Sequence, residues 1–443
     1  MGTALFIGGV VIMTLAIILS IALHEIGHLV PAKLFNVRVP QYMIGFGSTI
    51  FSRKVGETEY GIKAIPLGGY ISMIGMYPPA SKTTRHNRLS QIYQDARDID
   101  AERITPKDEG RLFYQLPVYK RIIIMLGGPT MNLLIGVLCM AVLILGFGKY
   151  QPTTTIETIS QCVHTVTATN ADQANRASCT NTDPDSPAHA AGLIAGDTIT
   201  VFAGEQVTSW EQLTSLIQRN ANHAVPVTVE KDGKTRELTI TPLETVRPVY
   251  NQLTGQYEKN SDGTYKTITV GFIGVSPTSE LTPGHIGQVL PEVGNTLERI
   301  GATVLKLPAR VFSVGESLVT GSERPADSPV SVVGVGRAAG EIAATGRIDL
   351  RSKSATLISL IGSMNLMLFV FNLIPLLPLD GGHVAGALWE GLRKGWARLR
   401  GKANPGPFDP VKLLPLTWVV AGAFILMSAV LILADIIKPI NLF

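Results

Sequence analysis

The stretch that decides the fold is residues 4–23, ALFIGGVVIMTLAIILSIAL, which continue directly into His24-Glu25-Ile26-Gly27-His28. Residues 4–23 hold no charge and have about the 20 residues that a helix needs to cross a bilayer. No Lys or Arg precedes them and no small-residue cleavage pattern follows, so we expect them to stay in the mature protein rather than be removed as a signal peptide. With three later apolar stretches we expect four membrane spans, the others being 122–147, 355–377 and 414–437.

Composition agrees with a membrane protein that carries one folded domain outside the bilayer. The chain has 443 residues, of which 46% are hydrophobic and only 16% charged. That is too long for one ordinary core and too apolar for a typical soluble enzyme. The net charge is +4, without a basic low-complexity tract or a Lys/Arg patch interleaved with aromatic residues. We therefore expect a lipid bilayer as the surroundings and no nucleic acid as a partner.

The distribution of Lys and Arg predicts the orientation in the membrane, because short basic loops stay in the cytoplasm. Residues 1–23 hold no Lys or Arg, residues 31–121 hold fourteen, and residues 378–413 hold six. We therefore expect both basic segments to lie on the cytoplasmic side of the inner membrane. Both termini and the long segment between the second and third spans would then lie outside the cytoplasm. Cys162 and Cys179 belong to that outer segment, where a disulfide between them can persist.

The sequence His24-Glu25-Ile26-Gly27-His28 has the HExxH spacing of a metal site. On a helix, positions i and i+4 lie on one face, so both imidazoles can reach one ion. Glu25 lies beside that face and could take a proton from water at the metal. Ionisable side chains that follow an apolar span are costly when unpaired, which favours a functional role. The alternatives are a chance match and a buried structural pair of histidines.

A catalytic zinc site needs three protein ligands, so a third one must come from elsewhere in the chain. We expect it to be Asp380, in the stretch NLIPLLPLDGGH at 372–383, at the cytoplasmic end of the third span. In the predicted orientation the first and third spans both end on the cytoplasmic side. His24 and His28, at the end of the first span, and Asp380, at the end of the third, then lie at the same membrane depth. An Asp before two glycines could instead be a turn residue. We leave His383 out of the ligand set.

HExxH in the first span together with NLIPLLPLDGG in a later one resembles the site-2 protease family of intramembrane zinc metalloproteases, over the whole chain. Gly127-Gly128-Pro129 with Asn132, in the second span, resembles the central motif of that family. The resemblance implies cleavage of membrane-spanning segments on the cytoplasmic side of the membrane. The substrates that it implies are anti-sigma factors whose outer part another protease has already removed, and remnant signal peptides. It implies a Zn²⁺ cofactor, and the ligands and catalytic base that it assigns are His24, His28, Asp380 and Glu25.

Two asparagines near these motifs have two interpretations. Asn132 and Asn372 could bind an extended substrate backbone, or the oxyanion of the reaction, through their amides. Polar asparagines in membrane helices also join neighbouring helices by hydrogen bonds. We interpret Gly127, Gly128 and Gly136 as close-packing residues rather than catalytic ones.

The segment after the second span contains one recognisable domain. The stretch SPAHAAGLIAGDTI at 186–199 precedes strand-like runs and resembles a PDZ domain over residues 155–245. A single PDZ-like domain is typical of the shorter bacterial members of the family. Beyond it, apolar residues recur at helical spacing over 284–319, which predicts an amphipathic helix bounded by Pro291 and Pro308. That helix would lie on the membrane surface or pack on the PDZ-like domain.

The segment between the first and second spans predicts a β-hairpin. Alternating runs at 49–53 and 59–65 are followed by a predicted turn, Pro66-Leu67-Gly68-Gly69, and then by a polar loop with partial helix at 77–116. A substrate helix must unwind before its peptide bonds can be cut. The hairpin, at 42–66, has a free edge that could hold the unwound segment by strand addition.

We therefore expect a polytopic α-helical membrane protein with about four spans, a membrane-associated β-hairpin on the cytoplasmic side and an outer PDZ-like α+β domain. Other interpretations are a non-catalytic membrane scaffold that displays a PDZ module, a transporter with broken spans, and a metalloprotease with an aqueous active site. We expect four membrane helices, at 1–30, 121–148, 354–380 and 414–443. On the cytoplasmic side we expect a hairpin region and loop at 31–120 and a second loop at 381–413. On the outer side we expect a PDZ-like domain at 149–250, followed by a region with the amphipathic helix at 251–353.

Overall fold

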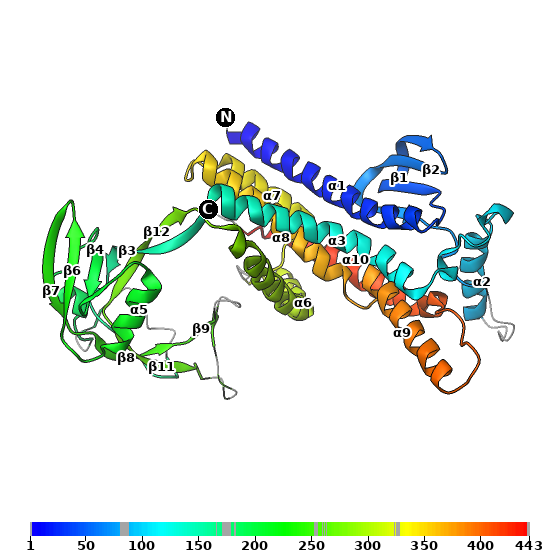
Figure 1. The fold of residues 1–443 in the computed structure, drawn as a ribbon. Helices are drawn as coiled ribbons and strands as arrows, with labels where there is room; N and C mark the ends of the chain where they lie inside the picture. The colour runs from blue at the N-terminus through cyan, green and yellow to red at the C-terminus, as the bar shows by residue number, and fades with distance from the viewer. Residues whose placement is uncertain are drawn as a thin grey trace. The chain divides into compact units, whose positions relative to one another are not determined.

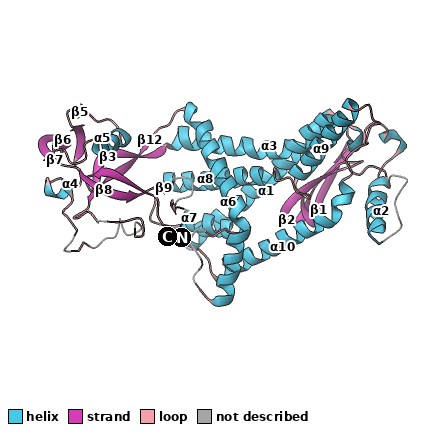
Figure 2. Cartoon of the chain, turned by 90° about the horizontal axis from the view of Figure 1, so that it is seen from below, coloured by secondary structure: helices cyan, strands magenta, loops and turns pink. Residues whose placement is uncertain are grey.

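The computed structural model forms two compact units, one of Met1–Leu143 with Gly287–Phe443 and one of Ile144–Ile286. The first unit is a helix bundle with one β-hairpin, and the second is built on a β-sheet (Figure 1, Figure 2). The residues that the structure describes are 2–79, 88–164, 166–170, 179–180, 183–251, 256–258, 260, 262, 264–322, 324 and 328–440.

Four helices of the described chain are long and apolar enough to cross a bilayer, which confirms the predicted number. The outward side chains of the first helix are apolar, as lipid-facing positions require, and include Leu5, Val11, Leu15 and Leu19. The four are α1 at Gly2–Leu34, α3 at Val118–Val142 with a π-helical turn at Leu143–Phe147, α8 at Leu350–Asn372, and α10 at Leu414–Ile437 after a 3-10 turn at Pro410–Leu413.

Small residues let these helices approach one another closely. Gly27 of α1 and Gly127 of α3 are in backbone contact, since a Cβ on either would collide with the carbonyl of the other. Gly136 of α3 packs against α8 in the same way. In addition, the buried amide of Asn365 on α8 donates to Ser20 Oγ on α1, at 3.0 Å. Lipid is as apolar as the helix faces, so close packing and interhelical hydrogen bonds hold such a bundle together.

The predicted hairpin is present and is longer than expected. It consists of β1 at Gln41–Val55 and β2 at Thr58–Ser72, which pair antiparallel. The predicted turn at 66–69 is wrong, because β2 continues through it and Ile44 pairs with Gly69. In the predicted polar loop, a helix α2 forms at Arg88–Ala101, with 3-10 turns at Pro106–Asp108 and Phe113–Gln115. Residues 80–87 of that loop lie outside the described residues.

The amphipathic helix is α6, at Val289–Thr320, and its predicted end at Pro308 is wrong. Pro291 lies in the first turn, where the missing N–H costs nothing. Pro308 removes one hydrogen bond inside the helix, but Leu307 and Val314 on either side of it are buried. Val314 packs with Leu431 of α10. α6 therefore packs against the membrane helices α3, α8 and α10, an environment that the sequence did not predict.

The predicted third membrane segment, 354–380, is divided in two. α8 ends at Asn372, and a separate helix, α9 at Asp380–Leu399, begins at Asp380 itself. Pro375 and Pro378 lie between them and cannot continue a helix. α9 thus fills half of the segment predicted as a cytoplasmic loop. One more helix, α7 at Val332–Ala344, packs along α1.

The second unit has a six-stranded sheet with the order β12-β3-β4-β6-β7, in which β5 also pairs with β4. Its core contains Ile199, Phe202, Leu213 and Val229. Cys162 and Cys179 form a disulfide in this unit. The elements are β3 at Lys149–Ile159, α4 at Pro187–Ala190, β4 at Thr198–Phe202, β5 at Glu205–Gln206, α5 at Trp210–Arg219, β6 at Val225–Lys231, β7 at Lys234–Ile240, β8 at Leu243–Pro248, β9 at Tyr250–Asn251, β10 at Gln256–Tyr257, β11 at Thr267–Phe272 and β12 at Val275–Thr282.

Candidate metal centre

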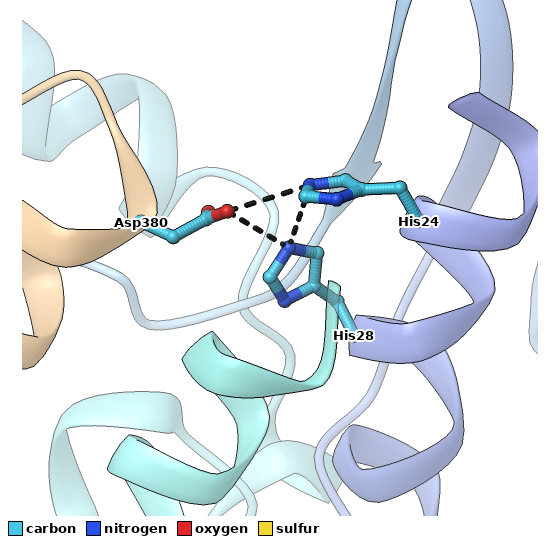
Figure 3. A group of neighbouring side chains, drawn as sticks. All are labelled: His24, His28 and Asp380. Carbon is cyan, nitrogen blue, oxygen red and sulfur yellow. Dashed lines mark hydrogen bonds and ion pairs between the residues drawn. The ribbon is translucent and has the colours of Figure 1, made fainter. Parts of the chain in front are cut away.

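His24, His28 and Asp380 meet inside the helical unit. Figure 3 shows the two imidazoles of α1 and the carboxylate at the start of α9 pointing toward one another. The Nε2 atoms of His24 and His28 are 3.2 Å apart, and Asp380 Oδ2 is 3.4 Å from each of them. The structure thus brings together side chains that lie far apart in sequence, since Asp380 lies 356 positions after His24.

The break between α8 and α9 positions Asp380. After Asn372 the chain turns over seven residues, and Gly381 and Gly382 lie directly against that turn. A Cβ on Gly381 would collide with the carbonyls of Leu373 and Ile374. The two glycines therefore let the first turn of α9 fold tightly onto the segment that leads into it. Asp380, one residue earlier, is thereby directed toward α1.

Groups of α3 contact both imidazoles. His28 Nδ1 lies 2.7 Å from the carbonyl oxygen of Ile124. A carbonyl can only accept, so Nδ1 carries the proton and Nε2 offers its lone pair to the centre. Gly128 lies over both rings, and a Cβ there would collide with the Nε2 atom of His28 and press on His24. The glycine at this position is therefore required by the close approach of α3 to the imidazoles.

Asn132 contacts His24 rather than an open cleft. Its side-chain amide is 3.2 Å from His24 Nδ1, and the residue is only 1% exposed. Its Oδ1 is buried without a hydrogen-bond partner among the described residues. The oxygen and nitrogen of an asparagine amide can be told apart only by their hydrogen bonds. If the amide of Asn132 is turned by about 180°, Oδ1 and Nδ2 exchange places and Oδ1 faces the Nδ1–H of His24. Oδ1 then accepts the Nδ1–H of His24, and His24 also presents Nε2 to the centre.

Glu25 lies between the metal centre and the hairpin. It is buried on α1, and its carboxylate accepts the backbone N–H of Ile71 on β2. A Cβ on Gly69 of β2 would lie 2.9 Å from Glu25 Cγ. The hairpin is fixed to α1 nearby, because Tyr42 Oη donates to the carbonyl of Ala22 at 2.8 Å. Burial raises the pKa of Tyr42 to about 12, so this phenol stays protonated and remains a donor.

The donor set has the geometry of a tetrahedral zinc site. Zinc binds imidazole nitrogen and carboxylate oxygen at about 2.0–2.2 Å, which places neighbouring ligand atoms of a tetrahedron roughly 3.3–3.6 Å apart. The observed separations are 3.2 Å and 3.4 Å. Asp380 Oδ2 is buried and makes no well-aligned hydrogen bond among the described residues. Two neutral imidazoles and one carboxylate leave a fourth position open, as a catalytic zinc site requires.

Two other predicted residues lie apart from these ligands. Asn372 is the last residue of α8 and makes no hydrogen bond to the three ligand side chains in the described part of the chain. His383 is one turn into α9 and is not part of the cluster. A second group of donor atoms, Cys162 with His164 and Asp183, lies in the β unit. Its sulfur is already bonded to Cys179, so it is not available as a thiolate ligand.

Sequence reasoning missed the ion pair that ties α9 to α3. Glu390 of α9 is fully buried and accepts from Arg121 of α3 at 2.5 Å, from Lys394 at 2.6 Å and from the backbone N–H of Phe408 at 2.7 Å. Burial works against ionisation of Glu390, but these three donors more than offset it and hold its pKa below the usual range. Arg121 and Glu390 are 269 residues apart, and nothing local in the sequence pairs them.

Comparison with known proteins identifies the family of this chain. The sequence profile of peptidase family M50 matches residues 12–404. The chain is 30% identical to the zinc metalloprotease Rip1 of Mycobacterium tuberculosis, over 99% of this chain and 100% of the relative. It is 28% identical to Rip1 of Mycolicibacterium smegmatis over 98% of both chains, and 26% identical to metalloprotease MmpA of Caulobacter vibrioides over 87% of both. The chain therefore belongs to peptidase family M50, the site-2 protease family, and is a multi-pass membrane zinc metalloprotease.

Proposed function

We propose that this protein is a zinc endopeptidase that cuts membrane-spanning segments of other proteins within the bilayer. His24, His28 and Asp380 hold the zinc, and Glu25 is the catalytic base. The observation that carries the proposal is the convergence of the three ligand atoms, with a buried carboxylate beside them, in a bundle of apolar helices. When bound, zinc polarises the scissile carbonyl and lowers the pKa of water toward neutrality.

The protein groups around the centre have separate tasks. Glu25 takes the proton of the attacking water and later delivers it to the leaving amide nitrogen. The N–H of Ile71 holds its carboxylate in place, so that the base is oriented before substrate binds. The apolar helices exclude bulk water, which strengthens each of these electrostatic contacts. A substrate must reach this centre with its helix already opened, because helical peptide bonds are occupied by their own hydrogen bonds.

Replacement of Glu25 separates metal binding from chemistry. We expect Glu25→Gln to keep the zinc content of the wild type and to lose cleavage by about 10²–10⁴-fold, the usual contribution of a general base. Asp380→Ala should lose zinc and cleavage together. The measurement is cleavage of a model membrane helix without its external domain, with zinc determined on each purified protein. Full activity of Glu25→Gln would remove the base role. A zinc-loaded wild type that cuts no helix would favour the membrane scaffold instead.

We further propose that Asn132 positions His24 and does not bind the oxyanion. The predicted role in substrate or transition-state support needs an amide that faces the reacting carbonyl. Asn132 is instead enclosed, and its amide contacts the far side of a zinc ligand. A partner that accepts from the second ring nitrogen of a ligating histidine fixes its tautomer and makes it a stronger ligand. Asn372 keeps its predicted role in substrate binding, since it leads into the segment that delivers Asp380.

Two substitutions of Asn132 distinguish these roles. We expect Asn132→Ala to weaken zinc binding by about 10–100-fold, measured by competition with a chelator. Asn132→Asp keeps an acceptor toward His24 and should bind zinc nearly as the wild type does. The absorption spectrum of the cobalt-substituted protein should change in the Ala variant and not in the Asp variant. If Asn132 served the oxyanion, both variants would keep zinc affinity and lose turnover, and Asn132→Asp would be the more severe.

The hairpin is proposed to hold the opened substrate segment by strand addition. The contacts that Glu25 makes with Gly69 and Ile71 narrow the receiving edge to Gly68–Ile71 of β2, at the end of the hairpin beyond the predicted 42–66. This part of β2 pairs with β1 on one side and faces Glu25 on the other. Backbone hydrogen bonds along such an edge would position a substrate without requiring a particular sequence.

Photo-crosslinking tests which edge receives the substrate. Benzoylphenylalanine replaces an aromatic residue with little change, and the hairpin offers Tyr70, between the two residues that contact Glu25, and Phe51 on the other strand. With Glu25→Gln to prevent turnover, the probe at position 70 should capture a model membrane helix and the probe at position 51 should not. Equal capture, or capture at 51 alone, would contradict the assignment of the edge.

The β unit is proposed to be a PDZ-like domain on the outer side of the membrane. Ser186 caps α4 by accepting the N–H of His189, and buried Asp197 binds Arg236, so the motif predicted from sequence forms a short helix and a turn into β4. The disulfide agrees with an oxidising compartment. Such a domain would admit single-pass proteins whose external part has been removed, among them anti-sigma factors and remnant signal peptides.

Labelling of single cysteines tests this sidedness. In a Cys139→Ala background, we expect Lys234→Cys, at the exposed start of β7, to react with a membrane-impermeant maleimide on intact spheroplasts. Asn404→Cys, in the loop before α10, should react only after the membrane is opened, because basic loops stay in the cytoplasm. Labelling of both positions in the opposite order would invert the proposed topology and place the metal centre near the outer side.

A further inference from the structure

α9 carries an exposed apolar stripe that no part of the described chain covers. Its members are 52–85% exposed. At 3.6 residues per turn they fall within an arc of roughly 100° on one side of the helix. We call this set the α9 stripe, and it consists of Leu388, Trp389, Leu392, Trp396 and Leu399.

The opposite side of α9 is fixed to the protein. Gly386 packs against Phe408, and Glu390 is held by Arg121 of α3 and by the loop at Phe408. Arg393 also donates to the carbonyl of Gly406 in that loop. The helix therefore cannot turn its stripe inward without breaking a buried ion pair, which is strongly destabilising once one partner is lost.

Positive charge borders the stripe. By helical geometry Arg400 lies along one of its edges with Arg393 beside it, and Arg398 lies roughly 80° beyond the other edge. Lys402 follows the helix, and residues 391–408 contain no Asp or Glu. A groove of about 550 Å³ opens here, lined among others by Trp389, Trp396, Arg393 and Lys402. An apolar floor with a cationic rim is complementary to a ligand with apolar chains and an anionic head.

The position of α9 in the chain indicates where such a ligand is found. α8, a membrane span, ends eight residues before Asp380, and the fourth span begins at Pro410. Arg121, which binds Glu390, lies in the first turn of the second span. α9 is thus connected at its start to the third span, through its following loop to the fourth span, and in its middle, through Glu390, to the second span. Helices with Trp and Leu on one face and Arg at the borders lie in the membrane interface.

We propose that the α9 stripe binds anionic phospholipid at the bilayer surface, with the tryptophans and leucines among the acyl chains and the exposed Arg398, Arg400 and Lys402 on the headgroup phosphates. Attraction of cations near an anionic surface is worth about fivefold in binding for each residue. Because α9 begins at Asp380, the same contact would hold one end of the metal-site helix at a set depth. That consequence rests on the proposed function, but lipid binding itself does not.

Tryptophan quenching tests the proposal without any measurement of activity. The full-length protein with Trp210→Phe and Trp418→Phe keeps only the two tryptophans of the stripe. It is placed in nanodiscs that contain phosphatidylcholine and phosphatidylglycerol, with one lipid or the other brominated in its chains. We expect brominated phosphatidylglycerol to quench more strongly than the same fraction of brominated phosphatidylcholine. The difference should shrink at high salt, because exposed charges are screened.

Charge variants identify the residues responsible. Arg398→Gln with Arg400→Gln and Lys402→Gln should abolish the preference for the anionic lipid and leave the general quenching intact. A matched control, Arg219→Gln with Lys234→Gln and Lys266→Gln in the β unit, should keep it. The salt dependence of the parent protein gives a second measurement if the first triple variant does not fold. Equal quenching by both lipids at low salt would overturn the proposal. The absence of quenching by either lipid would also overturn the proposal. In that case, a dimer that dissociates when Leu392 is replaced by Glu (Leu392→Glu) would identify a second copy of the protein as the occupant of the stripe.

Discussion

The structure depends on one constraint, which is that two imidazoles and a carboxylate must meet at one depth inside an apolar bundle. Each of these groups alone would be costly at the end of a membrane helix. Together, with Nε2 atoms and a carboxylate oxygen within 3.4 Å, they form a set that a divalent cation can neutralise. The early end of α8, the two glycines after Asp380 and the start of a new helix all serve this meeting. A continuous third span could not direct Asp380 across to α1 in this way.

Packing between α1 and α3 is coupled directly to the chemistry of the centre. In a bilayer, helices associate through close contact rather than through the hydrophobic effect. The contact of Gly27 with Gly127 brings the carbonyl of Ile124 to His28 and the amide of Asn132 to His24. The residues that pack the helices therefore also decide which ring nitrogen faces the metal.

The ion pair of Arg121 with Glu390 is the main polar anchor of α9. Burying two charges is costly, and their attraction offsets this only when the remaining hydrogen-bonding capacity is also satisfied. Glu390 meets that condition through Lys394 and the N–H of Phe408. The pair specifies one orientation of α9, with the stripe of Leu and Trp residues turned outward. The ion pair on one side of α9 and the proposed lipid contact of the stripe on the other would thus both restrain the helix that starts at Asp380.

The sequence alone determined the features that depend on local pattern. Apolar length predicts a span, and the spacing of His24 and His28 predicts a shared helix face, because both follow from the geometry of one helix. Asp380 was predicted from its surroundings and from charge distribution. Only the tertiary structure decided what depends on distant partners. β2 continues past Pro66 because β1 pairs with it, and α6 continues past Pro308 because α10 packs against it. Asn132 turns to His24, and Arg121 to Glu390, through contacts between helices far apart in sequence, which no local spacing records.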